Sequence, residues 1–329
     1  MIEILSGAPL ATVQDLGRLG ALRWGVGYSG AMDPLALICG NLLVGNDRDA
    51  AAVEAQLFPF EARFNADGAI AVTGADCAAT LDGAPLLPWA STPVRAGQRL
   101  RLDHPKPGAW SGARAYVCVA GGIDTALALG SRSTQLRGAI GGHEGRALRP
   151  GDVLPVGAAP AGASSEPCGV MPPALAMPLE VDGLPAIRVL PAAEYACFSP
   201  ASQEAFWSGA YKVTPQSDRY GFRLFGPELL PSVPLELRSH GIVPGVIQVP
   251  HGGQPIVQMR DAQPSGGYPK IATVIEADLW RLGQIPIGRS VRFLRATWAE
   301  AIEAARVNER WIDEVARLVD LFRTRSARS

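Results

Sequence analysis

Residues 245–275 read GVIQVPHGGQPIVQMRDAQPSGGYPKIATVI and contain three apolar runs rich in valine and isoleucine. Segments holding glycine, proline and polar residues separate the runs, and such segments mark turns and loops. The stretch therefore predicts three short strands joined by loops. Similar runs recur at 69–75, 113–122 and 187–191, so the sequence predicts a mainly β fold with a few helices.

Turn signals support this fold class, since the chain of 329 residues holds 37 glycines and 28 prolines. Asp82-Gly83 predicts a two-residue hairpin, because both residues tolerate a positive φ. Three further segments share a glycine, a polar residue and then alternating apolar positions. Each predicts a tight turn entering a strand, and together they suggest equivalent positions in barrel-like β modules: RAGQRLRL (95–102), RPGDVLPV (149–156) and PIGRSVRF (286–293).

Two helices are predicted. The first follows Asp33, which can cap a helix, and Pro34, which suits the first helical position, and it ends near Gly45. Its expected apolar face holds Leu35, Ile38 and Leu42. The second lies near the C-terminus, where apolar residues at helical spacing form a stripe along one face. We expect this stripe to cover its own domain; the alternative is contact with a partner. The stripe comprises Trp298, Ile302, Ala305, Ile312, Val315, Val319 and Phe322.

The length suffices for two domains of ordinary size. Residues 157–186 are rich in alanine, proline, glycine and serine and lack a clear period, which is typical of a linker or a long surface excursion. We therefore expect a β-rich N-terminal module at 1–160, a linker at 161–186, a second β module at 187–296 and a C-terminal helix at 297–329.

Composition excludes several classes of protein. The hydrophobic content is 47%, the formal net charge is −1, and no segment concentrates basic residues with aromatics, so we expect no nucleic-acid or membrane partner. No apolar run approaches the roughly 20 residues of a membrane-spanning helix, and the N-terminus does not resemble a signal peptide. Five scattered cysteines and four isolated histidines predict free thiols in a reducing cytoplasm and no metal site.

Familiar nucleotide and nucleophile motifs are missing from the sequence. There is no G-x-x-x-x-G-K-[ST], because no glycine directly precedes a lysine, and there is no G-x-S-x-G. No methionine precedes a lysine, so the usual context of a biotin-acceptor lysine is also missing.

Polar residues instead gather in glycine-rich clusters. The first, at 12–33, brings backbone N–H groups and short polar side chains close to an anion or an amide. As an alternative, it is only a glycine-rich loop that leads into a capped helix. The polar residues of this cluster are Gln14, Asp15, Arg18, Ser29 and Asp33.

The second cluster, SDRYGFRLFGP at 217–227, holds Arg219 and Arg223, whose guanidinium groups suit carboxylates and phosphates. The alternative for this cluster is surface ion pairing with Asp218. The third cluster runs from Ser239 to Lys270. It ends in SGGYPK, where one of only three lysines in the chain follows two glycines. This end is either a plain turn or a loop that faces a ligand, and we favour the loop.

These clusters closely resemble one family. The matching segments are TVQDLGRLG, GVGYSGAMDPLA, NLLVGN, GSRSTQLRGAIGGHEGRALRPGD, SDRYGFRL and GVIQVPHGGQPIVQMRDAQPSGGYPKIATVIEADL. They resemble the biotin-dependent carboxyltransferase family, also called the allophanate hydrolase subunit 2 family, which includes the C component of prokaryotic 5-oxoprolinase. The resemblance runs from about residue 12 to residue 293.

The resemblance implies two cyclophilin-like β-barrel modules and a hetero-oligomeric enzyme. In the prokaryotic enzyme, three components named A, B and C together convert 5-oxo-L-proline to L-glutamate with ATP. The implied partners are therefore a B-type protein, similar to allophanate hydrolase subunit 1, and an A-type protein. The substrate is a lactam with a carboxylate, which calls for cationic side chains and for paired amide donors and acceptors. The resemblance leaves open whether this chain itself contacts ATP.

The polar clusters supply the residue types that this substrate calls for. As catalytic residues we predict Asp15, Asp33, Arg219 and Lys270. As substrate-binding residues we predict Gln14, Arg18, Ser29, Arg223, Gln248, Asp261, Gln263, Gly266, Gly267 and Tyr268.

Two other functions stay open at this point. One is a carboxyltransferase component that acts on urea or another amide through carboxybiotin, with the biotin carrier on another chain. The other is a non-catalytic regulatory protein, because some relatives of this family are described as antagonists of a sporulation kinase inhibitor.

Overall fold

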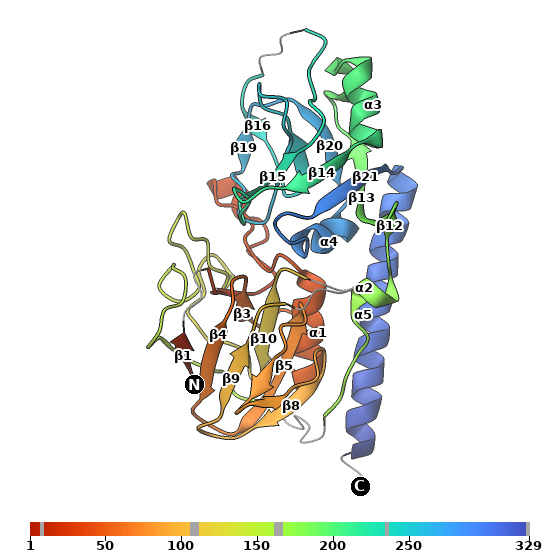
Figure 1. Cartoon of the computed structure of the whole chain (residues 1–329). Coiled ribbons are helices and arrows are strands. Elements are labelled where there is room, and N and C mark those ends of the chain that lie inside the picture. The colour runs from red at the N-terminus through yellow and green to blue at the C-terminus, as the bar shows by residue number, and fades with distance from the viewer. Residues whose placement is uncertain (7–9, 106–111, 161–166, 234–236, 327–329) are drawn as a thin grey trace. The chain divides into compact units, whose positions relative to one another are not determined.

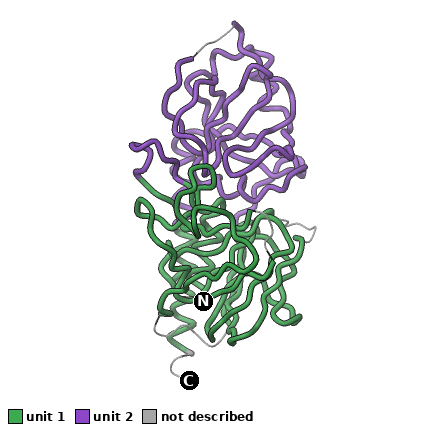
Figure 2. The backbone as a smooth tube through the Cα atoms, turned by 90° about the vertical axis from the view of Figure 1, so that its left-hand side faces the viewer, with its two compact units in different colours: residues 1–19, 29–176, 310–329 green, residues 20–28, 177–309 purple. Residues whose placement is uncertain are grey.

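The computed structural model describes residues 1–6, 10–105, 112–160, 167–233 and 237–326. They form two compact units, one comprising Met1–Leu19, Ser29–Ala176 and Arg310–Ser329 and the other Gly20–Tyr28 and Met177–Glu309 (Figure 2). Most regular structure is β, as the sequence predicts (Figure 1). In the described part of the chain, no helix is long and apolar enough to span a membrane.

The first unit contains two sheets. Its six-stranded sheet has the order β11-β1-β4-β9-β6-β7 and its five-stranded sheet the order β2-β3-β10-β5-β8. The strands are β1 (Ile2–Ser6), β2 (Thr12–Gln14), β3 (Ala52–Ala55), β4 (Phe60–Phe64), β5 (Gly68–Gly74), β6 (Thr80–Leu81), β7 (Ala84–Pro85), β8 (Ser91–Val94), β9 (Arg99–Leu102), β10 (Ala115–Val119) and β11 (Val153–Leu154).

The two sheets enclose one apolar core, to which Ile4 and Phe60 contribute from one sheet and Val72 and Val117 from the other. Helix α1 (Pro34–Val44) packs on the other face of the five-stranded sheet, where Leu37 joins Tyr116 in a second core. The predicted cap is confirmed, since the Asp33 carboxylate accepts the Ala36 N–H at 3.0 Å. Almost the whole helix is buried, rather than only the predicted face.

The second unit is a closed barrel of seven strands. Its order is β13-β20-β17-β18-β15-β14-β21, and parallel pairing of β21 with β13 closes the ring. The barrel strands are β13 (Leu184–Pro191), β14 (Ala210–Val213), β15 (Gly221–Phe225), β17 (Val246–Gln248), β18 (Ile256–Gln258), β20 (Lys270–Val274) and β21 (Ser290–Arg295). Strand β12 (Glu180–Val181) pairs antiparallel with the start of β13, and β16 (His240–Gly241) pairs with β19 (Ser265–Gly266).

Short helices complete the second unit: α3 (Pro200–Ser208), α4 (Leu279–Gly283) and the 3-10 turns η1 (Ala21–Trp24), η2 (Tyr195–Cys197) and η3 (Glu276–Asp278). Helix α2 (Pro173–Ala176) belongs to the first unit. The predicted linker is therefore partly ordered. Its residue Gly169 pairs with Ala90, which directly precedes β8, and the remainder runs into α2 and β12, while 161–166 lie outside the described residues.

Helix α5 (Trp298–Ser326) is present, but the apolar stripe predicted for it is wrong in the first half of the helix. Val315 and Val319 are buried in the core of the first unit, as predicted. Trp298 and Ile302, however, are 75% and 53% exposed. The packing positions of this half belong to Ala301 and Ala304, which contact Ile275 and Ala277; their small side chains allow a close approach of the helix.

Local turn signals are confirmed. Asp82 and Gly83 have φ of 49° and 84° between β6 and β7. Gly97, Gly151 and Gly288 all adopt φ of 88–89° just before β9, β11 and β21. The shared sequence pattern thus encodes the same left-handed turn three times, twice in the first unit and once in the barrel.

Gly288 provides a test of this turn, because a Cβ added there meets no atom within 4 Å. Gly288→Ala should lower the free energy of unfolding by about 1–2 kcal/mol through left-handed backbone strain alone. Gly288→Asn should cost less, since asparagine tolerates this conformation. Gly68→Ala is the control, with equally open space and no positive φ, and should change stability by about 0.5 kcal/mol or less. Urea denaturation measures all three, and equal losses at 288 and 68 would contradict the assignment.

Candidate functional site

The carboxylate of Asp15 is the hub of the glycine-rich loop in the first unit. It follows β2 and accepts the Gly17 N–H at 2.7 Å and the Ser131 hydroxyl at 2.7 Å. It also accepts the Arg132 N–H and the Ser133 hydroxyl, and the residue is only 8% exposed. Four donors from its own chain therefore hold the predicted catalytic carboxylate in place.

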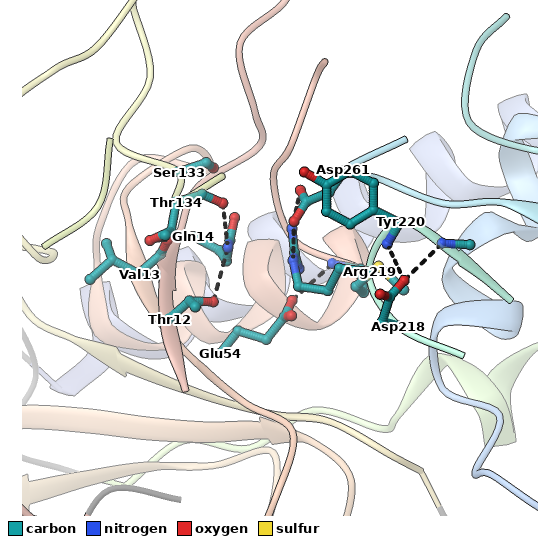
Figure 3. A network of polar contacts seen from close by, with 12 residues as sticks. Thr12, Val13, Gln14, Glu54, Ser133, Thr134, Asp218, Arg219, Tyr220 and Asp261 are labelled. Carbon is teal, nitrogen blue, oxygen red and sulfur yellow. Dashed lines mark hydrogen bonds and ion pairs between the residues drawn. The ribbon is translucent and has the colours of Figure 1, made fainter. Parts of the chain in front are cut away.

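Arg18 extends the same network, since its guanidinium donates to the backbone carbonyl of Ser133, the residue whose hydroxyl contacts Asp15. The Gln14 amide donates to Thr12 Oγ1 at 2.9 Å and to Thr134 O at 3.1 Å (Figure 3). The structure thus brings together Asp15 and Arg18, and it ties the β2 loop to 131–134.

Two of the predicted site residues in this unit carry a buried oxygen without a hydrogen bond among the described residues. Gln14 Oε1 and Ser29 Oγ have no partner among the described residues, and both side chains are fully buried. Buried polar atoms are normally paired, so such atoms are candidates for contact with a ligand or a water molecule. Ser29 has a φ of 54°, a conformation that few non-glycine residues adopt.

Asp33 belongs to a second buried network around Glu54. Its backbone N–H donates to the Tyr116 hydroxyl at 2.8 Å, and that hydroxyl donates to Glu54 Oε2 at 2.7 Å. The Met32 N–H also donates to Glu54, and Arg114 lies 3.9 Å from its other oxygen. Burial, followed by the charges of Glu54 and Asp33, raises the pKa of Tyr116, so this phenol stays a proton donor.

A cavity of about 400 Å³ in the first unit lies beside the Asp15 network. Asp47, Asp49 and Asp124 line it with Asp15, and Arg132 pairs with Asp124 at 2.6 Å. Its carboxylates favour a cationic group over an anion. In the described part of the chain, no three histidine, cysteine or acidic residues converge as metal ligands.

In the second unit, Arg219 and Asp261 form a buried bidentate ion pair. Nε and Nη2 of Arg219 lie 3.0 Å from the two carboxylate oxygens, and the side chains are 4% and 0% exposed (Figure 3). The pairing of β15 with β18 explains why these residues meet. Beyond the ends of the two strands, the Asp261 N–H still donates to the Arg219 carbonyl, so the two residues lie opposite each other. The alternative pairing with Asp218 does not occur, because that carboxylate caps the turn at Tyr220 and Gly221.

Lys270 lies at the start of β20 in a third network. Its ammonium contacts Glu194 Oε2 at 2.8 Å and His240 Nε2, and only 12% of its side chain is exposed. His240 Nδ1 lies 2.9 Å from the Arg238 carbonyl, so Nδ1 carries the proton and Nε2 accepts from Lys270. Sequence reasoning missed Glu194 and His240, because neither lies near Lys270 in the chain.

Close packing explains why glycines occupy positions 266 and 267, shortly before Lys270. A Cβ on Gly266 would lie 2.7 Å from Gln248 Nε2, and one on Gly267 would lie 2.9 Å from the Leu237 carbonyl. Gln248 also reaches the carbonyl of Tyr268 at 3.4 Å. The structure therefore brings these four predicted residues, Gln248, Gly266, Gly267 and Tyr268, together.

Three predicted residues have exposed side chains. Tyr268 is 45% exposed, with the ring of His251 at 6.2 Å, and Gln263 is exposed in the loop after Asp261. Arg223 lies on the outer face of the barrel, beside a pocket of about 350 Å³. The catalytic and binding roles of all these residues remain predictions.

Comparisons with known proteins identify the family to which this fold and these clusters belong. The carboxyltransferase domain family, subdomains A and B, matches residues 24–295. The C component of 5-oxoprolinase from Escherichia coli (strain K12) is 44% identical over 316 residues, 96% of this chain and 98% of that protein. The same component from Haemophilus influenzae is 42% identical, covering 97% and 99% of the two chains.

A solved structure agrees with the sequence comparison. The K. lactis urea amidolyase superposes on 95% of this chain with a TM-score of 0.86 at 29% identity, and the match spans 20% of that longer chain. A mainly β chain with a closed barrel and these matches is a carboxyltransferase-type protein. The chain belongs to the carboxyltransferase domain family, and its similarity to the C component of 5-oxoprolinase extends over nearly its full length.

The buried pair gives a stability prediction. Asp261→Asn removes the charged partner of this buried bidentate pair, and breaking such a pair costs about 3–5 kcal/mol. The thermal midpoint should therefore fall by roughly 8 °C or more. Glu314→Gln is the control, because the Glu314–Arg317 pair is more than half exposed and should contribute little. Similar small shifts for both variants in a thermal melt would show that the buried pair is not important for stability.

Proposed function

We propose that this chain is the C component of an ATP-dependent 5-oxoprolinase, which adds water across the lactam bond of 5-oxo-L-proline and releases L-glutamate. One observation carries the proposal: 44% identity over 98% of a protein named as the C component of 5-oxoprolinase. That protein is named as one part of an enzyme, which implies other parts, and we assign them as a B-type and an A-type protein. We place the complex in the cytoplasm, in keeping with five free thiols.

Within that complex, the chain's own residues are proposed to bind and orient the substrate. The lactam needs amide donors and acceptors, and Gln14 Oε1 and Ser29 Oγ are buried oxygens of that type with no partner among the described residues. In the second unit, and as a separate candidate for contact with the substrate, Lys270 supplies a positive charge from a rigid position, since Glu194 and His240 hold its ammonium. We assign ATP to the complex as a whole and no nucleotide contact to this chain.

The alternative is a carboxyltransferase component that acts on urea or another amide through carboxybiotin. The fold match to a urea amidolyase, with its TM-score of 0.86, favours it. In that case the biotin carrier belongs to another chain, because no lysine here follows a methionine.

The proposal is tested with the complex assembled from this chain and its B-type and A-type partners. Release of L-glutamate from 5-oxo-L-proline should require ATP and all three chains. Avidin should have no effect, because no biotin takes part. Avidin-sensitive activity on urea would replace the first function with the second.

The Lys270 site is tested in the same assay. Lys270→Met should lower kcat/KM at least about tenfold, because a hydrogen bond to a charged group contributes about 1.5–3 kcal/mol. Lys212→Met is the matched control, since Lys212 is exposed on β14, and should retain full activity. A thermal melt separates lost contact from lost folding, and full activity of a folded Lys270→Met complex would remove this residue from the site.

A further inference from the structure

Arg223 lies in a small pocket on the outer wall of the barrel. Strand β15 alternates, so that Phe222 and Leu224 are buried inside and Arg223 and Phe225 face outward. The pocket has a volume of about 350 Å³, at the small end of the roughly 300–1,000 Å³ typical of ligand sites. It is lined by β15, by the start of β18 and by the segment after β14, with Thr214, Gln216 and Ile256 beside the arginine.

Arg223 differs from the other predicted cations in its lack of an internal partner. Arg18 donates to the Ser133 carbonyl, Arg219 is paired with Asp261, and Lys270 is paired with Glu194. The Arg223 side chain has no hydrogen bond or ion pair with any residue that the structure describes. Its backbone is fixed all the same, because its N–H donates to Ser217 Oγ at 3.0 Å. A positioned arginine with an open guanidinium can receive an anion.

The rest of the pocket favours a carboxylate that has an apolar body. No lining residue is acidic, so nothing there neutralises the guanidinium. Thr214 also lines the pocket, and its buried hydroxyl is a second donor without a hydrogen-bond partner among the described residues. Phe225, Ile256 and Pro250 form apolar walls beside these donors. Such walls suit carbon atoms next to the anionic group better than a fully hydrated phosphate.

We propose that this pocket binds the carboxylate of a small organic acid, with Arg223 as the residue that recognises the charge. The identification of that acid as 5-oxo-L-proline rests on the proposed function. Its carboxylate pairs with the guanidinium and its ring carbons contact the apolar wall. Urea has no carboxylate, so we expect this pocket to bind 5-oxo-L-proline and not urea.

The test is binding to the purified full chain, measured by ligand-observed NMR titration in the absence of ATP and partners. The probes are 5-oxo-L-proline, 2-pyrrolidinone, which is the same ring without the carboxylate, urea and inorganic phosphate. We expect saturable binding of 5-oxo-L-proline alone, weakened about 10–100-fold in Arg223→Met, as expected for loss of a charge-assisted bond. Arg149→Met removes an exposed arginine of the first unit and should leave the affinity unchanged.

Other outcomes overturn the inference. Equal binding of 2-pyrrolidinone, or equal competition by phosphate, would show that no carboxylate is recognised. An unchanged affinity in folded Arg223→Met would place the acid elsewhere. This binding experiment needs no turnover, so it tests the pocket separately from the proposed function. If the assembled complex hydrolyses 5-oxo-L-proline but Arg223→Met binds it normally, the proposed function stands and the pocket assignment is wrong. If binding depends on Arg223 but no assembled complex hydrolyses 5-oxo-L-proline, the pocket assignment stands and the proposed function is wrong.

Discussion

Closure of the barrel by the parallel pairing of β13 with β21 constrains everything else in the second unit. A closed ring fixes the register of each strand, and the register decides which side chains point inward. It places Arg219 beside Asp261 at the end of the β15–β18 ladder and turns Arg223 outward two residues into β15. The two arginines lie only four residues apart, and the ladder explains why Arg219 is neutralised by Asp261 whereas Arg223 faces outward.

Local structure was predictable because its causes are local. The hairpin at Asp82-Gly83 and the three left-handed glycines before β9, β11 and β21 are encoded within a few residues. The cap of α1 at Asp33 is another such case. Alternation and turn residues were enough to assign the mainly β class, and a family resemblance supplied the barrel architecture.

The candidate site was predictable in composition but not in pairing. Asp261 lies 42 residues from Arg219, and Glu194 lies 76 residues from Lys270, so no spacing rule connects them. His240 belongs to no recognisable motif. It becomes a candidate only in the structure, where β16 pairs with β19. The prediction for the first half of α5 was also wrong. Alanines occupy the buried positions there, whereas the sequence pattern assigned them to Trp298 and Ile302.

The first unit is discontinuous, and this has a consequence for its synthesis. Its second core joins α1 and the five-stranded sheet to Val315 and Val319, which come from the part of α5 beginning at Arg310. A chain that grows from its N-terminus exposes the sheet and α1 long before those valines exist. The nascent first unit therefore carries an incomplete apolar face while the entire barrel is made. Its folding is completed last, although its first strand is translated first.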